Sequence, residues 1–129
     1  MNIHISEVDG VPIYLQIVNQ IKFLIASGRL SPTDELPPIR SLAEQLTVNP
    51  NTVARAYREL ELAGVVTKKR TTGTYVSEGA SRLSMEECKR ILAERIDALL
   101  AEAKHMDIDI EDVLDLVRAR EEIFRSEVA

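Results

Sequence analysis

The sequence predicts an α+β fold in which three helices and a β-hairpin come before a further pair of helices. Two observations carry this prediction. Residues 36–63 hold two short blocks of apolar positions at helical spacing, separated by a tight turn, and residues 65–76 hold β-branched runs on both sides of a Thr-Thr-Gly turn. We therefore expect a winged helix-turn-helix domain in residues 1–78 and a two-helix domain in residues 79–129.

The first part of this domain is expected to be scaffold. Residues 1–10 have the pattern of a short extended arm, with Ile3 and Ile5 on one face. Pro12 then opens a helix that Gly28 ends. The apolar stripe of this helix, which should pack beneath the two short helices, consists of Ile13, Ile17, Ile21, Leu24 and Ile25.

The second short helix carries the residues expected to read DNA. Asn49 followed by Pro50 is a strong start signal, because the Asn side chain accepts a hydrogen bond from a free amide and proline presets φ. Asn51, Thr52 and Arg55 then occupy the first turns, where a recognition helix presents hydrogen-bonding groups to base edges. A simple role in filling the first turn also explains Asn51 and Thr52.

Two more arginines belong to the same region. Arg40, in the first short helix, is interpreted as a direct DNA contact, because guanidinium groups bind phosphates and guanine edges. Arg58 lies further along the second helix beside Glu59, where a solvated side chain explains it as well as a contact with the DNA backbone does.

The hairpin brings a cluster of cations. Gly64 ends the second helix, and Lys68, Lys69 and Arg70 are expected on the first strand of the hairpin, close to its tip. Cations at the tip of a wing meet phosphates or a minor groove. The same charges also keep a strand edge from pairing with other chains, but their position favours the phosphate role.

Residues 79–129 are expected to hold two copies of the chain together. Ser84 and Glu87 form the pattern of a capping box for a helix that reaches about His105, and a second helix starts at Asp109. Two amphipathic helices cannot close a core alone, so a second copy is the simplest partner. The expected interface consists of Ile91, Leu92, Ile96, Leu99, Leu100, Val113, Leu116 and Val117.

Charge is unevenly distributed along the chain. The net charge of −5 is opposite to the basic balance of most nucleic-acid binders, but residues 79–129 account for it, with eight Lys and Arg against thirteen Asp and Glu. Residues 1–78 have eight of each, and between residues 38 and 76 six cations outnumber three acids. So modest a positive surface suggests that tight binding to DNA needs two copies of the domain.

The cysteine, histidine and apolar residues argue against disulfides, metal sites and membrane segments. Cys88 is the only cysteine, and His4 and His105 are far apart, so neither a disulfide nor a metal site or cofactor is expected. No apolar run reaches the ~20 residues that span a bilayer, and the N-terminus lacks the charged start of a signal peptide. We therefore expect a cytoplasmic protein with no membrane partner.

Five motifs resemble, in order and spacing, those of the GntR family of bacterial transcription regulators. They are IYLQI at residues 13–17, LPPIRSLA at 36–43, NPNTV at 49–53, AYRELE at 56–61 and GTYV at 73–76. The short two-helix segment and the Asn-Pro-Asn-Thr start are most similar to the YtrA subfamily. The resemblance implies a dimeric winged-helix repressor of an inverted-repeat operator, often acting on its own operon and on neighbouring transporter genes.

The chain departs from the family pattern at several DNA-facing positions. Thr71 and Thr72 stand where the wing tip usually has glycine and lysine, and Pro50 and Ala54 stand where many relatives have arginine. Base contacts should then come from other residues of the recognition helix. The full set expected to contact double-stranded DNA is Arg40, Asn49, Asn51, Thr52, Arg55, Arg58, Lys68, Lys69, Arg70, Thr72 and Gly73.

Two other function classes are alternatives to a DNA-binding regulator. An enzyme is not expected, because residues 79–129 lack a nucleophile with its base and a Gly-rich phosphate loop. A helical adaptor that binds proteins and no operator is the alternative. Two helices should leave little volume for a ligand pocket, so a small-molecule effector, if there is one, is expected at the dimer interface or between the two domains.

Overall fold

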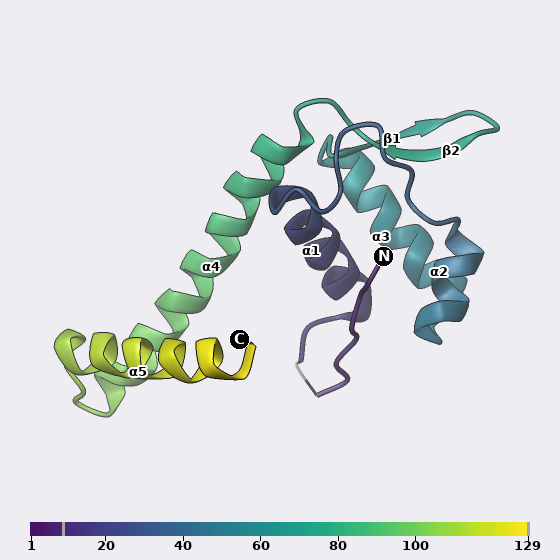
Figure 1. Ribbon diagram of the computed structural model, residues 1–129. Helices are drawn as coiled ribbons and strands as arrows, with labels where there is room; N and C mark the ends of the chain where they lie inside the picture. The colour runs from purple at the N-terminus through teal and green to yellow at the C-terminus, as the bar shows by residue number, and fades with distance from the viewer. Residues whose placement is uncertain (9, 129) are drawn as a thin grey trace. The chain divides into compact units, whose positions relative to one another are not determined.

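The computed structural model describes residues 1–8 and 10–128 and has the predicted α+β organisation (Figure 1). Its elements are α1 (Ile13–Ala26), α2 (Ile39–Leu46), α3 (Pro50–Leu62), β1 (Val66–Lys69), β2 (Gly73–Val76), α4 (Ala80–His105) and α5 (Ile110–Val128). The chain divides into two compact units, which we call the head unit (Met1–Lys89) and the tail unit (Arg90–Ala129). The sequence analysis expected two domains that meet after residue 78, and this domain boundary stays a prediction.

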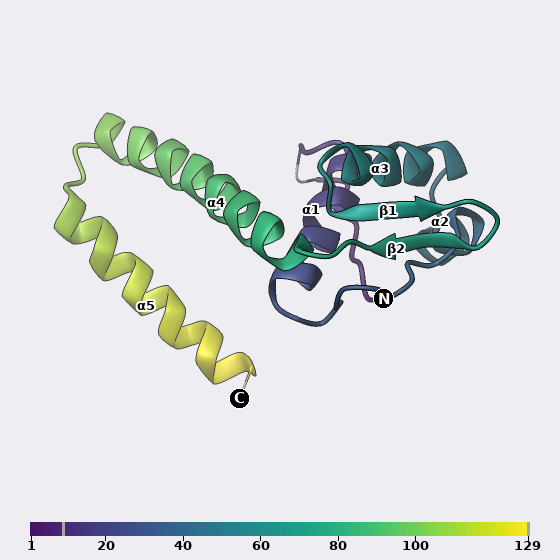
Figure 2. The same ribbon diagram turned by 90° about the horizontal axis from the view of Figure 1, so that it is seen from above.

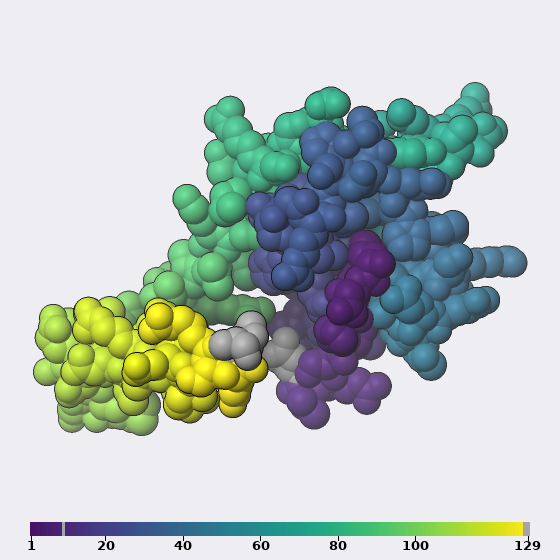
Figure 3. Space-filling view, in the orientation of Figure 1, coloured from purple at the N-terminus to yellow at the C-terminus, as the bar shows by residue number. Residues whose placement is uncertain are grey.

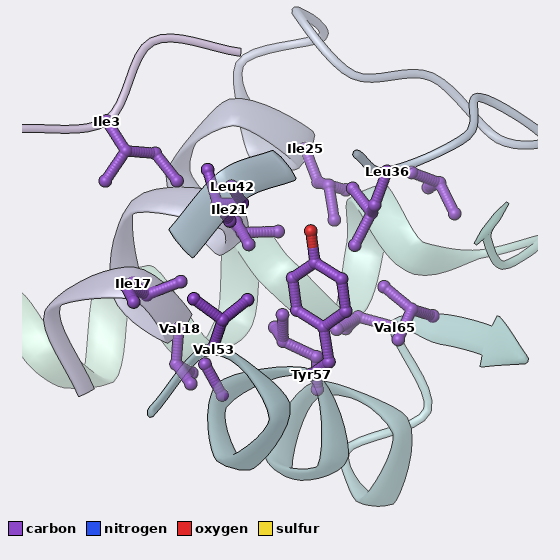
Figure 4. Close-up of a cluster of buried hydrophobic side chains, with 14 of the residues drawn as sticks. Ile3, Ile17, Val18, Ile21, Ile25, Leu36, Leu42, Val53, Tyr57 and Val65 are labelled. Atoms are coloured by element: carbon purple, nitrogen blue, oxygen red, sulfur yellow. The ribbon is translucent and has the colours of Figure 1, made fainter. Parts of the chain in front are cut away.

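The core of the head unit lies where α1, α2 and α3 meet. Ile17, Ile21 and Ile25 of α1 are fully buried, as the stripe predicted, and they pack with Leu42 of α2 and Val53 of α3 (Figure 4). Burying an aliphatic side chain of this size contributes about 1.5–3 kcal/mol. Packing of α1 therefore fixes α2 and α3 in place, which is the scaffold role expected of it.

The turn between α2 and α3 is formed by a left-handed residue that ends α2 and an N-cap residue that starts α3. Thr47 takes the left-handed conformation with φ 56°, and the Val48 amide donates to the Ala43 carbonyl at 3.0 Å, which ends α2. Asn49 is the N-cap residue of α3, since its Oδ1 accepts from the Asn51 amide at 2.8 Å. The predicted start of the recognition helix at Pro50 is confirmed.

The wing is an antiparallel hairpin in which Val66 pairs with Val76 and Lys69 with Gly73. Arg70 was expected on the first strand but lies in the turn at the tip, because the tight connection takes up residues 70–72 and leaves Gly73 to begin β2. Figure 2 shows the two strands running along α3.

A third segment, which the sequence did not reveal, pairs with the outer edge of β2. The Leu36 amide donates to the Thr74 carbonyl at 2.8 Å, and the Val76 amide donates to the Asp34 carbonyl at 2.8 Å. Glu35 also forms a bridge with Tyr75. The wing is thus tied to the stretch that leads into α2, which couples its orientation to the helix-turn-helix.

The N-terminal arm is held by two glutamines of α1 rather than by a β-sheet. Gln20 exchanges two hydrogen bonds with the backbone of His4, at 2.9 and 2.6 Å, and Gln16 exchanges two with Ser6, at 2.8 and 2.7 Å. Ile3 is buried in the core, as expected for one face of the arm. In Figure 3 the first residues, in purple, lie along the surface of the head unit.

Helix α4 starts earlier than predicted, and the capping box expected at Ser84 and Glu87 is wrong. The helix begins at Ala80, after Gly79 with φ 76°, so Ser84 lies inside it. Starting at Ala80 buries that side chain completely in the core, and Ser84 is buried as well. Glu87 instead approaches Lys22 of α1, with 3.9 Å between Nζ and Oε1. Tertiary packing has overridden the local signal.

In the tail unit, α4 ends at His105 and a short turn leads to α5, as expected. Asp107 takes φ 57° in this turn, and Asp109 caps α5 because its Oδ1 accepts from the Asp112 amide at 3.0 Å. Between the two helices lies an open apolar groove of about 480 Å³, whose floor includes Ala103, Val113 and Phe124. The expectation that two helices leave little volume is therefore wrong, because no described element of the tail unit covers this side of the groove.

Candidate nucleic-acid interface

The predicted base-reading residues lie at the start of the helix-turn-helix. Arg40 stands exposed in the first turn of α2, and Asn51 stands exposed in the first turn of α3 beside the half-buried Thr52. The Oδ1 atom of Asn49 is occupied by the capping hydrogen bond, which leaves its amide nitrogen available. In both ribbon views, α2, the N-terminal end of α3 and the tip of the wing lie at the same end of the head unit (Figures 1 and 2).

The two arginines further along α3 have different surroundings. The guanidinium carbon of Arg55 lies 3.7 Å from the centre of the Tyr14 ring, which belongs to α1. This distance is that of a close cation–π contact. Arg58 is exposed, and in the part of the chain that the structure describes it has no hydrogen-bond or ion-pair partner. Arg55 is therefore held at one place on the flank of α3, whereas Arg58 is not.

The wing places its cations on β1 and at the tip, which protrudes from the head unit in Figure 3. Lys68 is exposed on β1, and Arg70 and Thr72 are exposed in the turn. Lys69 has its Nζ atom 4.8 Å from the centre of the Tyr75 ring, on the facing strand. The wing residues expected to contact DNA are thus accessible, with Lys69 partly fixed by an aromatic face.

Gly73 has a structural role that the sequence did not suggest. Its φ of 137° belongs to the region that favours glycine, and a Cβ atom there would lie 2.6 Å from Oε1 of Glu35. It is half-buried. Glycine is required here by the backbone conformation with which β2 begins, whether or not the backbone of Gly73 also meets DNA.

The cations of α2, α3 and the wing, which together we call the reading surface, have no carboxylate partner in the part of the chain that the structure describes. Among residues 1–8 and 10–128, no ion pair involves any of the six cations between residues 38 and 76. By contrast, Arg118 and Arg125 of α5 each pair with an acid one turn away, at 3.3 and 2.9 Å. The positive charge of α2, α3 and the wing is thus left unneutralised and available to an anionic partner.

Tyr57 and Cys88 are buried side chains of the head unit. Tyr57 is buried, donates from its hydroxyl to the Pro37 carbonyl at 2.6 Å, and has its pKa raised by burial. Burial likewise raises the pKa of the Cys88 thiol, a shift that the Lys22 charge opposes and the Glu87 charge reinforces. A thiol of raised pKa is poorly reactive, which fits a packed side chain.

The described residues show neither a metal site nor a membrane-spanning helix. They contain no group of three or more His, Cys, Asp or Glu side chains placed to hold a metal ion. Within the same residues, no helix combines the length and the apolar character that crossing a membrane requires.

Sequence reasoning missed two contributors to this surface. Tyr14 lies off the apolar stripe of α1, and nothing local in the sequence connects it with Arg55, 41 positions later. Residues 34–36 sit between prolines and show no strand pattern, although they pair with β2. Both contacts join segments far apart in the chain, so only the tertiary structure reveals them.

The predicted dimer residues form a largely exposed apolar face on the tail unit. Leu92 and Leu116 are 54% and 57% exposed, and Ile96, Leu99, Leu100 and Val117 are also exposed. Ile91 and Val113 are buried already in the single chain, at 8% and 6% exposure. These two side chains therefore lie beneath the exposed face and contribute little surface to it.

Comparison with known proteins agrees with the motifs. The model of the family described as "Bacterial regulatory proteins, gntR family" matches residues 13–76. The chain is 35% identical to the HTH-type transcriptional repressor YtrA of Bacillus subtilis (strain 168) over 116 residues, which are 90% of this chain and 89% of that protein.

Solved structures agree as well. A GntR family transcriptional regulator from Listeria monocytogenes matches with a TM-score of 0.70 and 32% identity over 86% of this chain and 96% of its own. YtrA from Sulfolobus acidocaldarius, a GntR-family transcription factor, matches with a TM-score of 0.59 and 38% identity over 74% of this chain and 97% of its own. The chain therefore belongs to the GntR family and is a DNA-binding transcriptional regulator.

Proposed function

We propose that the chain is a homodimeric repressor that binds an inverted-repeat operator, each copy contributing α2, α3 and the wing. The observation that carries this proposal is the set of six cations on these elements, none of which has a carboxylate partner among the described residues. Phosphate contacts supply most of the affinity of DNA-binding proteins. Arg40, Asn51, Thr52 and Arg55 face the duplex from the two helices, and Lys68, Lys69 and Arg70 meet its backbone from the wing.

The tail unit joins the two copies in this proposal. Its exposed leucines and isoleucine, with the open groove between α4 and α5, make an apolar surface that a monomer would leave in water. A second copy of the same surface covers it through a two-fold axis, which is the usual symmetry of dimers. We propose residues 79–129 as the dimerisation region, and a small-molecule effector would bind at this interface.

The genes that the protein regulates are proposed from its family. Its own operon and adjacent transporter genes are the proposed targets, and the protein acts in the cytoplasm, where the DNA is. A two-fold dimer with two reading heads should prefer half-sites whose centres lie about one helical turn, or ~10 base pairs, apart.

The test is a footprint of the intact protein on the DNA upstream of its own gene. We expect protection of an inverted repeat, and we expect scrambling one half-site to remove most of the affinity. The matched control scrambles only the spacer, which should preserve binding. Absence of sequence-specific protection would contradict the proposal and favour the adaptor alternative, while full affinity for a single half-site would contradict the dimeric mode of binding.

A further inference from the structure

In the stack of Arg55 on Tyr14, a residue of α1, outside the helix-turn-helix and the wing, holds a side chain expected to meet DNA. Tyr14 is half-buried and packs against the core of the head unit, so its ring is firmly placed. Arg55 is exposed, yet its guanidinium carbon lies 3.7 Å from the ring centre. A long arginine side chain that would otherwise sample many rotamers is thus confined to one position.

The position of this guanidinium is on the side of α3 that faces α1. Asn51 and Thr52, in the first turn, occupy the tip of the recognition helix. A helix inserted into the major groove meets base edges at its tip and central face, and it meets the two phosphate backbones along its flanks. Because Arg55 is anchored to α1, its guanidinium should face a phosphate backbone at the side of the groove rather than the base edges.

The chemistry of the stacked group fits a phosphate. One face of the guanidinium is covered by the ring, whereas its N–H groups, which lie in the guanidinium plane, have no partner among the residues that the structure describes. Planar N–H donors of this kind bind phosphate oxygens in a bidentate manner. The negative face of the ring also offsets part of the cost of holding the cation in place.

Building on the proposed function, we propose that Arg55 contacts a DNA phosphate and that Tyr14 is the positioning residue that holds it there. This assignment differs from the base contact expected of Arg55 from the sequence alone. It makes the contribution of Arg55 independent of DNA sequence, and it makes that contribution depend on an aromatic ring at position 14.

The first experiment measures affinity by fluorescence anisotropy on two duplexes. One is a duplex enriched by the wild-type protein from a random pool, and the other is a scrambled duplex of the same composition. Arg55→Ala should weaken binding to both by the same factor, about 8-fold per bound copy at 0.1 M salt, and make the salt slope shallower by about 0.9 per copy. Loss confined to the enriched duplex would show a base contact and overturn the proposal.

The second experiment changes the ring. Tyr14→Leu should weaken binding to both duplexes by about two- to fivefold, the range of an exposed cation–π contact, and Tyr14→Phe should restore wild-type affinity because it keeps the ring. In the Arg55→Ala background, Tyr14→Leu should have no further effect. Arg58→Ala is the matched control, and its effect should add to that of Tyr14→Leu. Thermal melting of each variant checks that the head unit remains folded.

Two outcomes would overturn the positioning role: unchanged affinity of Tyr14→Leu, or an equal loss from Tyr14→Leu in the presence and absence of Arg55. Because phosphate contacts are independent of sequence, the scrambled duplex tests this inference even if the wild-type protein shows no preference for any operator. Lack of preference would count against the proposed function alone.

Discussion

Replacing Gly73 by alanine should destabilise the wing. Both a steric contact with Glu35 and backbone strain could contribute, and the structure indicates that the strain sets the loss of stability. A Cβ atom would lie 2.6 Å from Oε1 of Glu35 but 3.5 and 3.7 Å from the next two atoms of that side chain. The close atom is the end of a flexible carboxylate, which can rotate away at little cost. The φ of 137° cannot relax without moving β2, and such backbone strain costs about 1–3 kcal/mol.

The assay is chemical denaturation of the wild-type protein and three variants. Gly73→Ala should lower the free energy of unfolding by about 1–3 kcal/mol, and Glu35→Ala alone should change it by less than about 0.5 kcal/mol. The double variant should stay as unstable as Gly73→Ala, because removing the carboxylate leaves the backbone strain in place. Recovery of wild-type stability in the double variant would show that the steric contact dominates.

A local measurement follows the wing itself. The amides of Leu36 and Val76 donate across the outer edge of β2, each at 2.8 Å. Strain at Gly73 should loosen this edge, so both amides should exchange with solvent faster in Gly73→Ala than in the wild type. Wild-type stability together with wild-type exchange rates would refute the reasoning, since it would mean that alanine fits this backbone without strain.

Three other substitutions and one change of pH have definite expectations. Tyr57→Phe removes the hydroxyl that donates to Pro37 and should lower the free energy of unfolding by about 1–3 kcal/mol, measured by urea denaturation. Because burial raises the pKa of Tyr57 above its usual value of about 10, wild-type stability should be complete below pH 10 and fall above it, and denaturation at pH 9 and 11 should show a smaller fall in Tyr57→Phe. Asn49→Ala should cost about 0.5–2 kcal/mol by removing the cap of α3, whereas Asn49→Asp should retain stability; equal melting temperatures of all three proteins would contradict the role of the cap. Ile96→Glu should yield monomers in sedimentation, because it buries an unpaired charge at the proposed interface, and an unchanged dimer would place the interface elsewhere.

Features set by neighbouring residues were predictable from the sequence. The start of α3 follows from Asn49 and Pro50, whose capping bond and fixed φ depend on nothing outside the turn. The end of α3 near Gly64 and the hairpin after it follow in the same way. The recognition helix and wing could therefore be located, with most of their cations, before any tertiary contact was known.

Features that depend on distant partners were not predictable. The segment of residues 34–36 pairs with the edge of β2 only because β2 lies beside it, and these three residues have no periodicity of their own. Ser84 carries a valid local capping signal, but the helix extends to Ala80 because that methyl group fills the core. Tyr14 acquires its relation to Arg55 in the same way. Local pattern predicted the candidate site, and long-range packing determines how its side chains are held.

The salt dependence of DNA binding measures how many of these cations are used. Each phosphate neutralised contributes about −0.9 to the slope of log K against log salt. The six cations between residues 38 and 76 then limit one copy to a slope of about −5.4, and two copies to about −11. A slope steeper than −5.4 for the full chain requires both reading surfaces on the DNA at once. The measurement is a titration of the enriched duplex at several salt concentrations, repeated with one half-site scrambled. A slope shallower than −5.4 that stays the same after one half-site is scrambled would contradict simultaneous binding by two copies.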